Sequence, residues 1–434
     1  MTTLSSTLAT VTPTDKAYRL LRSTYTTVGS PSLILLPRSV DEVSEALTYA
    51  ASTDLPVSIR SGGHGLSGSA SNDGGIVVDL GALNTVSVTD PATGIVRVGA
   101  GARWSQVASA LSPHELVISS GDHGNVGVGG LATAGGIGWL VRSYGLTIDH
   151  VRAATVVLPN GEVVRADAAE PDLFWAIRGA GSYVGVVTDF DIEAEHLPGL
   201  QVGQVMIEVD DAGTALRRWS EYMAEAPREL TMSGILTMSG SRVVLAMTAV
   251  VAEADPRAAA AMLAPLSNHR GTYRSPLTPA RYTELMPPGH IHANLGQQAT
   301  TTTNALFGRL TEASASALVE VARHRARPLL QVRGIGGAVN DIATDATAYP
   351  HRDAEVLVTA TLFPPLGGRE LGEAVAPMWP HALGAYRNFD SSPSSATFDR
   401  AFPGATGERV RELANRYDPD GVLSRTGGGP ERKC

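Results

Sequence analysis

The stretch RSGGHGLSG at residues 60–68 decides the fold, and it follows directly on residues 56–59, which we expect to form a short strand. A second glycine-rich stretch, SGDHGNVGVGG at residues 120–130, continues through GGIG at 135–138. Glycine lets another group approach the backbone closely, and successive N–H groups in a concave turn bind phosphate oxygens. Two such loops are suited to the pyrophosphate of a dinucleotide.

Neither loop fits the common nucleotide-binding motifs. The Rossmann fingerprint needs G-x-G-x-x-G between the first strand and helix of a βαβ unit, and the phosphate loop of nucleoside triphosphatases needs Gly-Lys followed by Ser or Thr. The alternative is that these glycines only allow tight turns. His64, flanked by Gly63 and Gly65, is either a polar or exposed residue near the phosphates or a nucleophile that attacks an electrophilic cofactor carbon. The residues alone leave both open.

Bulk composition limits the function classes. The chain has 434 residues and is 43% hydrophobic, which is enough for two domains. Its net charge of -9 provides no basic excess for a nucleic acid. The single cysteine, Cys434, permits no internal disulfide. The N-terminus lacks the pattern of a signal peptide, and no apolar run is long enough to span a bilayer, so we expect a cytoplasmic protein without a membrane partner.

The two halves of the chain differ in their glycine clusters and in the pattern of expected strands and helices. Residues 60–190 are dense in glycine clusters. In this half we expect helices over 14–29, 39–51 and 103–111, and strands over 33–36, 75–80, 94–98, 152–158 and 162–165, the last two joined by an Asn-Gly turn. After about residue 200 we expect strands over 202–209, 232–238, 242–250, 331–334 and 355–362, alternating with helices over 212–226, 255–264 and 313–326. Such alternation predicts a second α+β domain.

These motifs resemble the FAD-linked oxidases of the vanillyl-alcohol oxidase and p-cresol methylhydroxylase superfamily, within the berberine-bridge-enzyme-like branch. The resemblance is strong over residues 30–200, where it includes NDGGIVVDL at 72–80, YGL at 144–146, LFWAIRG at 173–179 and GVVT at 185–188. It returns more faintly at 336–338, 348–352, 386–389 and 417–419.

The resemblance implies a two-domain α+β fold of the FAD-binding p-cresol-methylhydroxylase type, with an antiparallel sheet in the substrate domain. Residues 1–200, completed by 380–434, would bind FAD, and residues 201–379 would bind substrate. His64 would bond to the 8α-methyl group of the flavin. The residues expected to bind the cofactor are Arg60, Ser61, Gly62, Gly63, His64, Gly65, Ser67, Gly121, Asp122, His123, Asn125, Val126, Gly127, Gly130, Gly135, Gly138, Trp139, Gly185, Val187, Tyr386 and Asn388.

His123 is an informative departure from the family pattern. Many members of the branch have a cysteine at this position, which forms a second bond to flavin C6. A histidine makes that thioether impossible, so the chain resembles members with a single attachment, and we expect His123 to make a polar contact near the flavin or the phosphates. Val128 falls where oxidases of the family have a small residue beside the flavin, which would admit oxygen.

The resemblance implies hydride transfer from a small-molecule alcohol or amine to flavin N5, removal of a proton from the adjacent O–H or N–H, and reduction of oxygen to hydrogen peroxide. The base is less clear. Tyr386 is the first candidate, beside Asn388, although ordinary packing would also explain it; a tyrosine base needs a lowered pKa, which Arg387 could supply. Glu355 begins a predicted strand and could instead face solvent.

His290 and His292 could also line the pocket, since residues i and i+2 of an extended segment share a face. The pair suggests a metal, but a third ligand is not evident, and catalytic zinc sites usually have three protein ligands. We therefore predict no metal. The expected partners are substrate and molecular oxygen, for a monomer or homodimer. The alternatives are a dehydrogenase, a flavin-dependent oxygenase or oxidative cyclase, and a binding protein without turnover. The substrate itself cannot be read from the residues.

Overall fold

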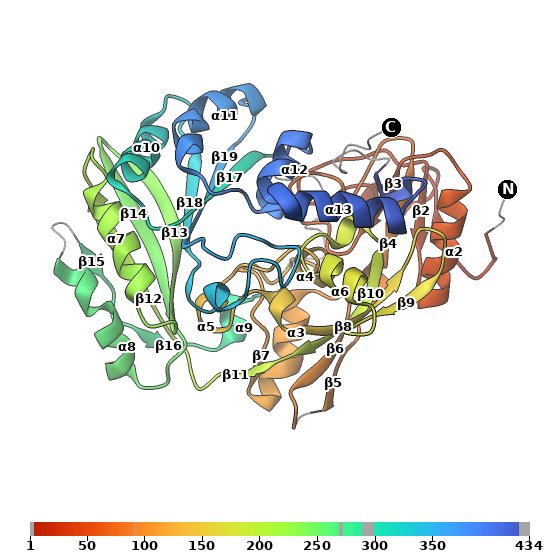
Figure 1. The fold of residues 1–434 in the computed structure, drawn as a ribbon, viewed down its shortest axis with the longest axis horizontal. Helices are drawn as coiled ribbons and strands as arrows, with labels where there is room; N and C mark the ends of the chain where they lie inside the picture. Colours follow the sequence, from red (N-terminus) through yellow and green to blue (C-terminus); the bar gives the residue numbers. More distant parts are fainter. Residues whose placement is uncertain (1–3, 91, 269–271, 289–298, 425–434) are drawn as a thin grey trace.

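The computed structural model describes residues 4–90, 92–268, 272–288 and 299–424. In these ranges the strands form two small sheets, a two-stranded pair of β7 (Leu116–Val117) and β11 (Glu195–His196), and one large sheet (Figure 1). The first small sheet has the order β1-β2-β4-β3, in which β2 and β3 both run parallel to β4. Its strands are β1 (Ala9–Val11), β2 (Leu33–Leu36), β3 (Val57–Arg60) and β4 (Ile76–Asp79). The first glycine loop therefore leaves the end of a buried parallel strand.

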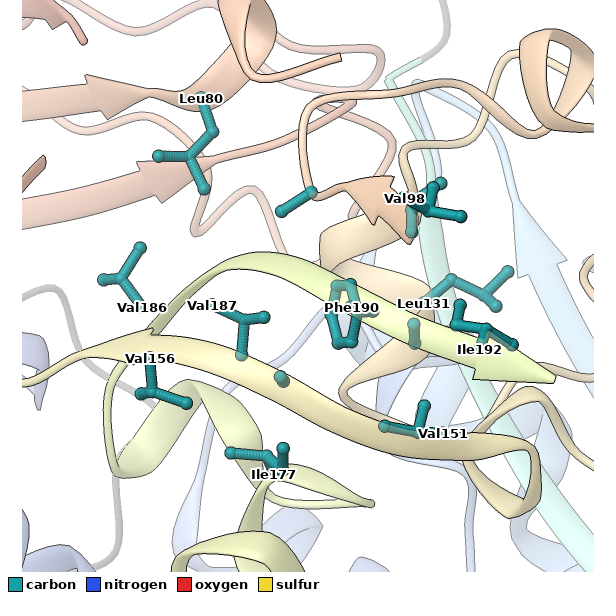
Figure 2. Packing of buried hydrophobic residues seen from close by; sticks show 14 of the residues in the cluster. Leu80, Val98, Leu131, Val151, Val156, Ile177, Val186, Val187, Phe190 and Ile192 are labelled. Carbon is teal, nitrogen blue, oxygen red and sulfur yellow. The ribbon is translucent and has the colours of Figure 1, made fainter. Parts of the chain in front are cut away.

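The second small sheet is antiparallel and supports the second glycine loop. Its order is β5-β6-β10-β8-β9, with β5 (Val86–Asp90), β6 (Ile95–Gly99), β8 (Val151–Val157), β9 (Val163–Ala166) and β10 (Val186–Glu193). In β10, buried Phe190 and Ile192 alternate with Asp189 and Asp191, which is the period of a strand with one face in a core. Figure 2 shows Phe190 and Ile192 packed against Val98 of β6 and Leu131 of α4 (Val128–Ala132).

The large sheet comes from the second half of the chain and is antiparallel. Its main path among the described residues is β15-β12-β14-β13-β18-β19-β17. The strands are β12 (Gln201–Val209), β13 (Leu230–Ser239), β14 (Arg242–Val251), β15 (Tyr273–Arg274), β17 (Thr301–Phe307), β18 (Leu329–Gly334) and β19 (Val356–Leu362), and β16 (Thr278–Pro279) pairs with β12. The predicted α+β class and antiparallel second sheet are confirmed.

Two twelve-residue helices cover one face of the large sheet. Figure 1 shows α7 (Thr214–Glu225) and α10 (Glu312–Arg323) on its outer side, where Leu216, Leu318 and Val332 share one apolar cluster. On the opposite face, the polar side chains of Gln331 and Arg333 in β18 line the same cavity as the glycine loops. This polar face forms one wall of the site.

The C-terminal helices return to the first half of the chain. Helices α12 (Ser395–Ala401) and α13 (Gly404–Tyr417), drawn in blue, lie over the small sheets in Figure 1. Phe398, Phe402 and Leu413 belong to the same apolar core as Val98 and Phe190. The end of the chain thereby closes the first core.

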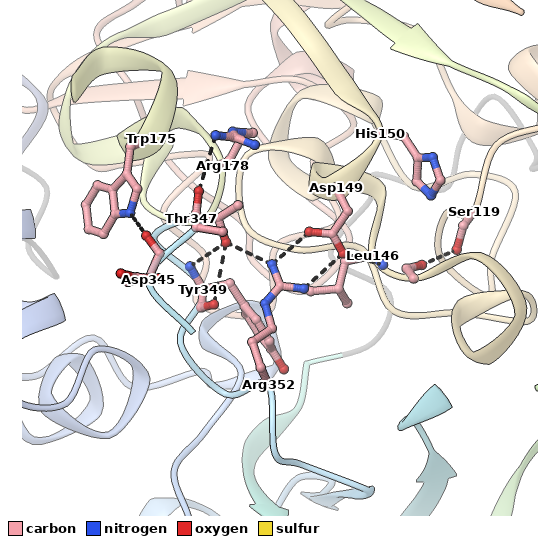
Figure 3. A network of polar contacts seen from close by, with 12 residues as sticks. Ser119, Leu146, Asp149, His150, Trp175, Arg178, Asp345, Thr347, Tyr349 and Arg352 are labelled. Carbon is pink, nitrogen blue, oxygen red and sulfur yellow. Dashed lines mark hydrogen bonds and ion pairs between the residues drawn. The ribbon is translucent and has the colours of Figure 1, made fainter. Parts of the chain in front are cut away.

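A buried polar network fastens residues 345–352 to Asp149 and to Trp175 of α6 (Pro171–Ile177), as Figure 3 shows. Arg352, 1% exposed, donates to both carboxylate oxygens of Asp149 at 2.7 and 2.9 Å. Thr347 accepts a third hydrogen bond from Arg352, at 2.9 Å. The paired geometry satisfies both charges away from water, so the segment between β18 and β19 is held against the first half of the chain.

The N-terminal helix predicted over residues 14–29 is much shorter. Only α1 (Tyr18–Leu21) is helical, and Thr24 then turns back so that its N–H donates to the carbonyl of Thr27. Hydroxyl side chains favour such turns over helix. The turn carries Tyr25 to the first glycine loop, where its backbone N–H donates to Gly63 at 2.8 Å.

Candidate functional site

A cavity of about 490 Å³ lies where the two glycine loops meet the polar face of the large sheet. The first loop lines it with residues 61–67, the second with residues 121–123, 126–127 and 129–130, and the sheet with Gln331 and Arg333 of β18. Residues 386–390 and Thr397, Phe398 and Ala401 of α12 also line the wall. Segments far apart in the sequence therefore build one site.

The two glycine loops touch through their backbones. A side chain on Gly62 would place its Cβ 2.2 Å from the nitrogen of Gly127, and one on Gly127 would meet Gly62 equally closely. Arg103 crosses the junction, and its Nη1 donates to the carbonyls of Gly62 at 2.5 Å and Asn125 at 2.6 Å. Glycine is required here because nothing larger fits between the loops.

The joined loops offer hydrogen-bond donors that the chain does not use. Gly62, Gly63 and Gly121 are buried, and in the described part of the chain their N–H groups donate to no residue. Buried backbone donors are nearly always paired in proteins. At Gly65 and Gly130 an added Cβ would meet only open space. This cradle fits an anionic group such as a pyrophosphate.

His64 sits in the first loop with its ring fixed from the side. The ring of Tyr25 stacks on it with centroids 4.6 Å apart and planes 12° apart. The Nε2 atom of His64 is buried and has no hydrogen-bond partner among the described residues. Burial is the largest cause that lowers the pKa of His64 to about 3, and the nearby Arg103 and His123 add to the effect. The imidazole is therefore neutral at pH 7, which is the nucleophilic form.

His123 lies across from His64, with ring centroids 5.3 Å apart. It is exposed on the cavity wall, and its Nδ1 accepts the N–H of Asn125 at 3.2 Å. A histidine ring that accepts a hydrogen bond at Nδ1 has its N–H at Nε2. His123 therefore offers a donor to the cavity, and its contact with the cofactor stays a prediction.

Tyr386 is a wall residue held from several directions. The side-chain amide of Asn304 bonds to both the N–H and the carbonyl of Tyr386, at 2.7 and 2.9 Å. Its Oη accepts the N–H of Gly136 at 3.1 Å, and its ring packs where a side chain on Gly135 would lie. Burial raises the pKa of Tyr386, outweighing the charge of Arg387. This is the opposite of the shift predicted for a tyrosine base.

Asn388 links Tyr386 to the second loop. Its Nδ2 donates to the carbonyl of Gly130 at 3.1 Å and lies 3.4 Å from the Oη of Tyr386. Both residues line the cavity, as the sequence predicts.

Arg333 and Gln331 are wall residues that the sequence interpretation missed. Arg333, 5% exposed, donates from Nε and Nη2 to Oδ2 of Asp122, at 3.2 and 2.8 Å. Its guanidinium also lies 4.9 Å from the ring centroid of Phe389. The available signal was the alternation of Leu329, Gln331 and Arg333 with buried Leu330 and Val332, which places the polar side chains on one face.

Most of the predicted residues line the cavity, but not all. The predicted residues on its wall are Ser61, Gly62, Gly63, His64, Gly65, Ser67, Gly121, Asp122, His123, Val126, Gly127, Gly130, Gly185, Val187, Tyr386 and Asn388. The cavity wall does not include Arg60, Asn125, Gly135, Gly138, Trp139 or Glu355. Arg60 instead pairs with Asp79 at 2.7 Å, away from solvent. It supports the loop from behind.

Glu355 is displaced from the site because it precedes β19 rather than facing the cavity. It lies against Gly336, and burial raises its pKa although Arg142 and Arg309 oppose that shift. His290 and His292 lie outside the described residues. Within the described ranges, no group of three or more His, Cys, Asp or Glu side chains could hold a metal ion.

Val128 also differs from its expected place. It is fully buried in the first apolar core and does not line the cavity. Val126, two residues earlier, does line it. The helix that begins at Val128 turns the side chain inward.

None of the helices in the described ranges is long and apolar enough to cross a membrane.

Comparisons with known proteins agree with a flavin site. Residues 31–167 match the family model described as an FAD binding domain. The chain is 40% identical to the (R)-6-hydroxynicotine oxidase of Paenarthrobacter nicotinovorans over 169 residues, a match that covers 39% of this chain and 37% of that protein. It is 28% identical to an FAD-linked oxidoreductase of Metarhizium anisopliae over 91% of this chain and 83% of that protein.

Solved structures share the whole fold. A glucooligosaccharide oxidase of Acremonium strictum, with 6-S-cysteinyl, 8α-N1-histidyl FAD, superposes with a TM-score of 0.87, at 21% identity and 98% coverage of both chains. Berberine bridge enzyme in complex with (S)-reticuline gives a TM-score of 0.82 at 22% identity, covering 99% of this chain and 96% of that one.

Proposed function

We propose that this chain is an FAD-linked oxidoreductase of the vanillyl-alcohol oxidase and p-cresol methylhydroxylase type, in the berberine-bridge-enzyme-like branch, and that it is an oxidase whose FAD is bonded to His64. The observation that carries this proposal is the state of His64. Its ring stacks on Tyr25 and lies on the cavity wall, and its buried Nε2 has no partner among the described residues, while burial lowers its pKa.

The two glycine loops would hold the pyrophosphate of FAD through the N–H groups of Gly62, Gly63 and Gly121. His123 occupies the position in the second glycine loop where many members of the branch have a cysteine. A histidine cannot form a thioether, which supports one attachment to the flavin rather than two. The histidyl FAD of the Acremonium oxidase supports the same bond type. When bound, FAD supplies an acceptor for the hydride of a substrate C–H bond and a route for its electrons to dioxygen.

The proton of the substrate O–H or N–H needs an acceptor on the cavity wall. Tyr386 is poorly suited because burial raises its pKa. Asp390 is fully engaged, since its oxygens accept from Thr303, Ser392 and Arg400.

Asp122 is better placed to accept that proton. Arg333 binds only its Oδ2, and within the described ranges no donor contacts its Oδ1. We assign Asp122 as the proton acceptor, with Tyr386 and Asn388 as residues that shape the wall beside it.

The substrate we propose is a small alcohol or amine of alkaloid or secondary metabolism. The nicotine oxidase relative supports the amine class, and the carbohydrate oxidase fold supports the alcohol class. A cytoplasmic enzyme is part of the same proposal. Screening alcohols and cyclic amines for peroxide release would identify the compound.

Two measurements test the proposal without a known substrate. After acid precipitation the protein should retain FAD, with one flavin on the peptide that contains His64, by mass spectrometry. Flavin that washes out, or a second bond, contradicts the attachment. Protein reduced by dithionite should reoxidise in air within seconds and release peroxide. If the reduced flavin persists for minutes in air but reacts at once with an artificial electron acceptor, the enzyme is a dehydrogenase.

A further inference from the structure

The stack of Tyr25 on His64 joins segments that are far apart in the sequence. Tyr25 comes from the turn before β2, whereas His64 follows β3. Both rings line the cavity. An interplanar angle of 12° at 4.6 Å is a near-parallel stack, a geometry that restricts rotation of the smaller ring.

The backbone fastens this turn to the loop on both sides of His64. The N–H of Tyr25 donates to the carbonyl of Gly63 at 2.8 Å, and the Oγ1 of Thr26 lies 3.4 Å from the carbonyl of Gly65. The turn and the loop are therefore one unit. Any movement of the loop carries Tyr25 with it, so the stack is kept.

Bonding to a carbon atom places two demands on an imidazole. It must be neutral, so that a ring nitrogen has a free electron pair, and it must point at that carbon. The buried position of His64 meets the first demand, because burial is the largest cause of its lowered pKa. Tyr25 meets the second, since a reacting group held in one orientation gains rate through lost rotational freedom.

We propose that Tyr25 is a positioning residue for covalent flavin attachment, holding the His64 imidazole in the orientation from which it bonds to the 8α carbon. This inference rests on the proposed attachment at His64. Tyr25 acts through His64, so its loss should slow bond formation rather than prevent the chain from folding or from binding FAD through the glycine loops.

The step balances as an oxidation of the flavin methyl group. A C–N bond forms between the 8α carbon and a nitrogen of His64, while one C–H bond and the imidazole N–H bond break. The two hydrogens leave as two protons and two electrons, which are taken up by the flavin ring system and then passed to dioxygen to give hydrogen peroxide. The chain itself supplies no oxidant.

The experiment compares three forms of the full chain made in riboflavin-starved cells: wild type, Tyr25→Leu and Tyr25→Phe. FAD is added at saturating concentration, and the acid-stable flavin is followed with time by mass spectrometry. Tyr25→Phe keeps the stacked ring and should attach flavin at the wild-type rate. Tyr25→Leu should attach it roughly 10–100-fold more slowly. Non-covalent FAD affinity and the melting temperature of the apoprotein should stay close to wild type.

Each outcome decides a separate point. A wild-type rate in Tyr25→Leu overturns the inference, and equal slowing in Tyr25→Phe assigns the effect to the hydroxyl and overturns the stacking argument. A wild-type protein that never forms acid-stable flavin contradicts the proposed function instead. If Tyr25→Leu melts early, Tyr25→Met, which keeps side-chain volume without a ring, replaces it and should attach flavin as slowly. A wild-type rate in Tyr25→Met would overturn the inference in the same way.

Discussion

The guanidinium of Arg333 donates from two nitrogens to a single carboxylate oxygen of Asp122, at 2.8 and 3.2 Å. Asp122 belongs to the second glycine loop, and Arg333 belongs to β18 of the large sheet. The pair therefore fixes the loop against the sheet at the cavity wall. It also leaves the second oxygen of Asp122 without a donor from the described residues, so the same contact that orients the carboxylate keeps one oxygen available.

Asp122→Asn should slow reduction of the flavin by substrate about 10²–10⁴-fold, the usual effect of losing a general base. The amide keeps the size of the side chain but cannot take up the proton. Anaerobic stopped-flow measurement, with the compound found in the peroxide screen, gives the rate. Arg333→Lys is the matched control, because it retains a cation near Asp122; it should lose less rate than Asp122→Asn. Unchanged reduction in Asp122→Asn would remove Asp122 from the chemistry.

Tyr386→Phe should act mainly on stability. The substitution leaves the buried N–H of Gly136 without its acceptor, and an unpaired buried donor costs about 1–3 kcal/mol. The melting temperature should fall, while the rate of flavin reduction should fall less than in Asp122→Asn. Thermal unfolding and single-turnover reduction measure the two effects. A large loss of reduction rate at an unchanged melting temperature would restore Tyr386 as the base.

The glycine loops could be predicted from sequence because their signal is local. A histidine between glycines after a strand identifies the first loop, and the repeated glycines identify the second. Arg333 could not be assigned in the same way, because its role depends on which face of β18 meets the loops. That face is set by the pairing of β18 with β13 and β19. The prediction that Glu355 lies at the site failed for a similar reason, since Glu355 precedes β19 and lies near Arg142.

Tyr25 shows the same limit. Its predicted helix is replaced by a turn that brings it to Gly63. Only the packing of two distant segments places its ring on His64, and no periodicity within either segment contains that information.

Stability should depend on pH through His351. This imidazole is buried, donates from Nε2 to the carbonyl of Ala401 at 3.0 Å, and has its pKa lowered by burial from 6.5 to about 4. Between these two values the unfolded chain binds a proton that the folded chain does not. The free energy of unfolding should therefore rise with pH through this window, and the His351 contribution should be constant above it.

His351→Gln tests this assignment, because glutamine keeps an N–H for Ala401 but does not titrate. Melting temperatures between pH 4.5 and 7.5 should fall less steeply toward acid in the variant than in the wild type. Identical slopes would assign the acid sensitivity to other groups.

Access of oxygen should be controlled at Val126 rather than at Val128. Val126 lines the cavity, whereas Val128 is fully buried in the first core. Val126→Phe should slow reoxidation of dithionite-reduced protein in air, because the larger side chain fills space on the cavity wall. The rate at which a small artificial electron donor reduces the flavin should change less than the rate of reoxidation.

Val128→Leu is the matched comparison from the same loop. An extra methylene in a packed core usually costs about 1–3 kcal/mol, so this variant should melt at a lower temperature and reoxidise at the wild-type rate. The two variants separate oxygen access to the flavin from packing of the core. Each changes one valine, and the two valines lie on opposite sides of the loop. Slow reoxidation in Val128→Leu with a wild-type rate in Val126→Phe would reverse the assignment and place the oxygen path behind the loop, through the core of the small sheets.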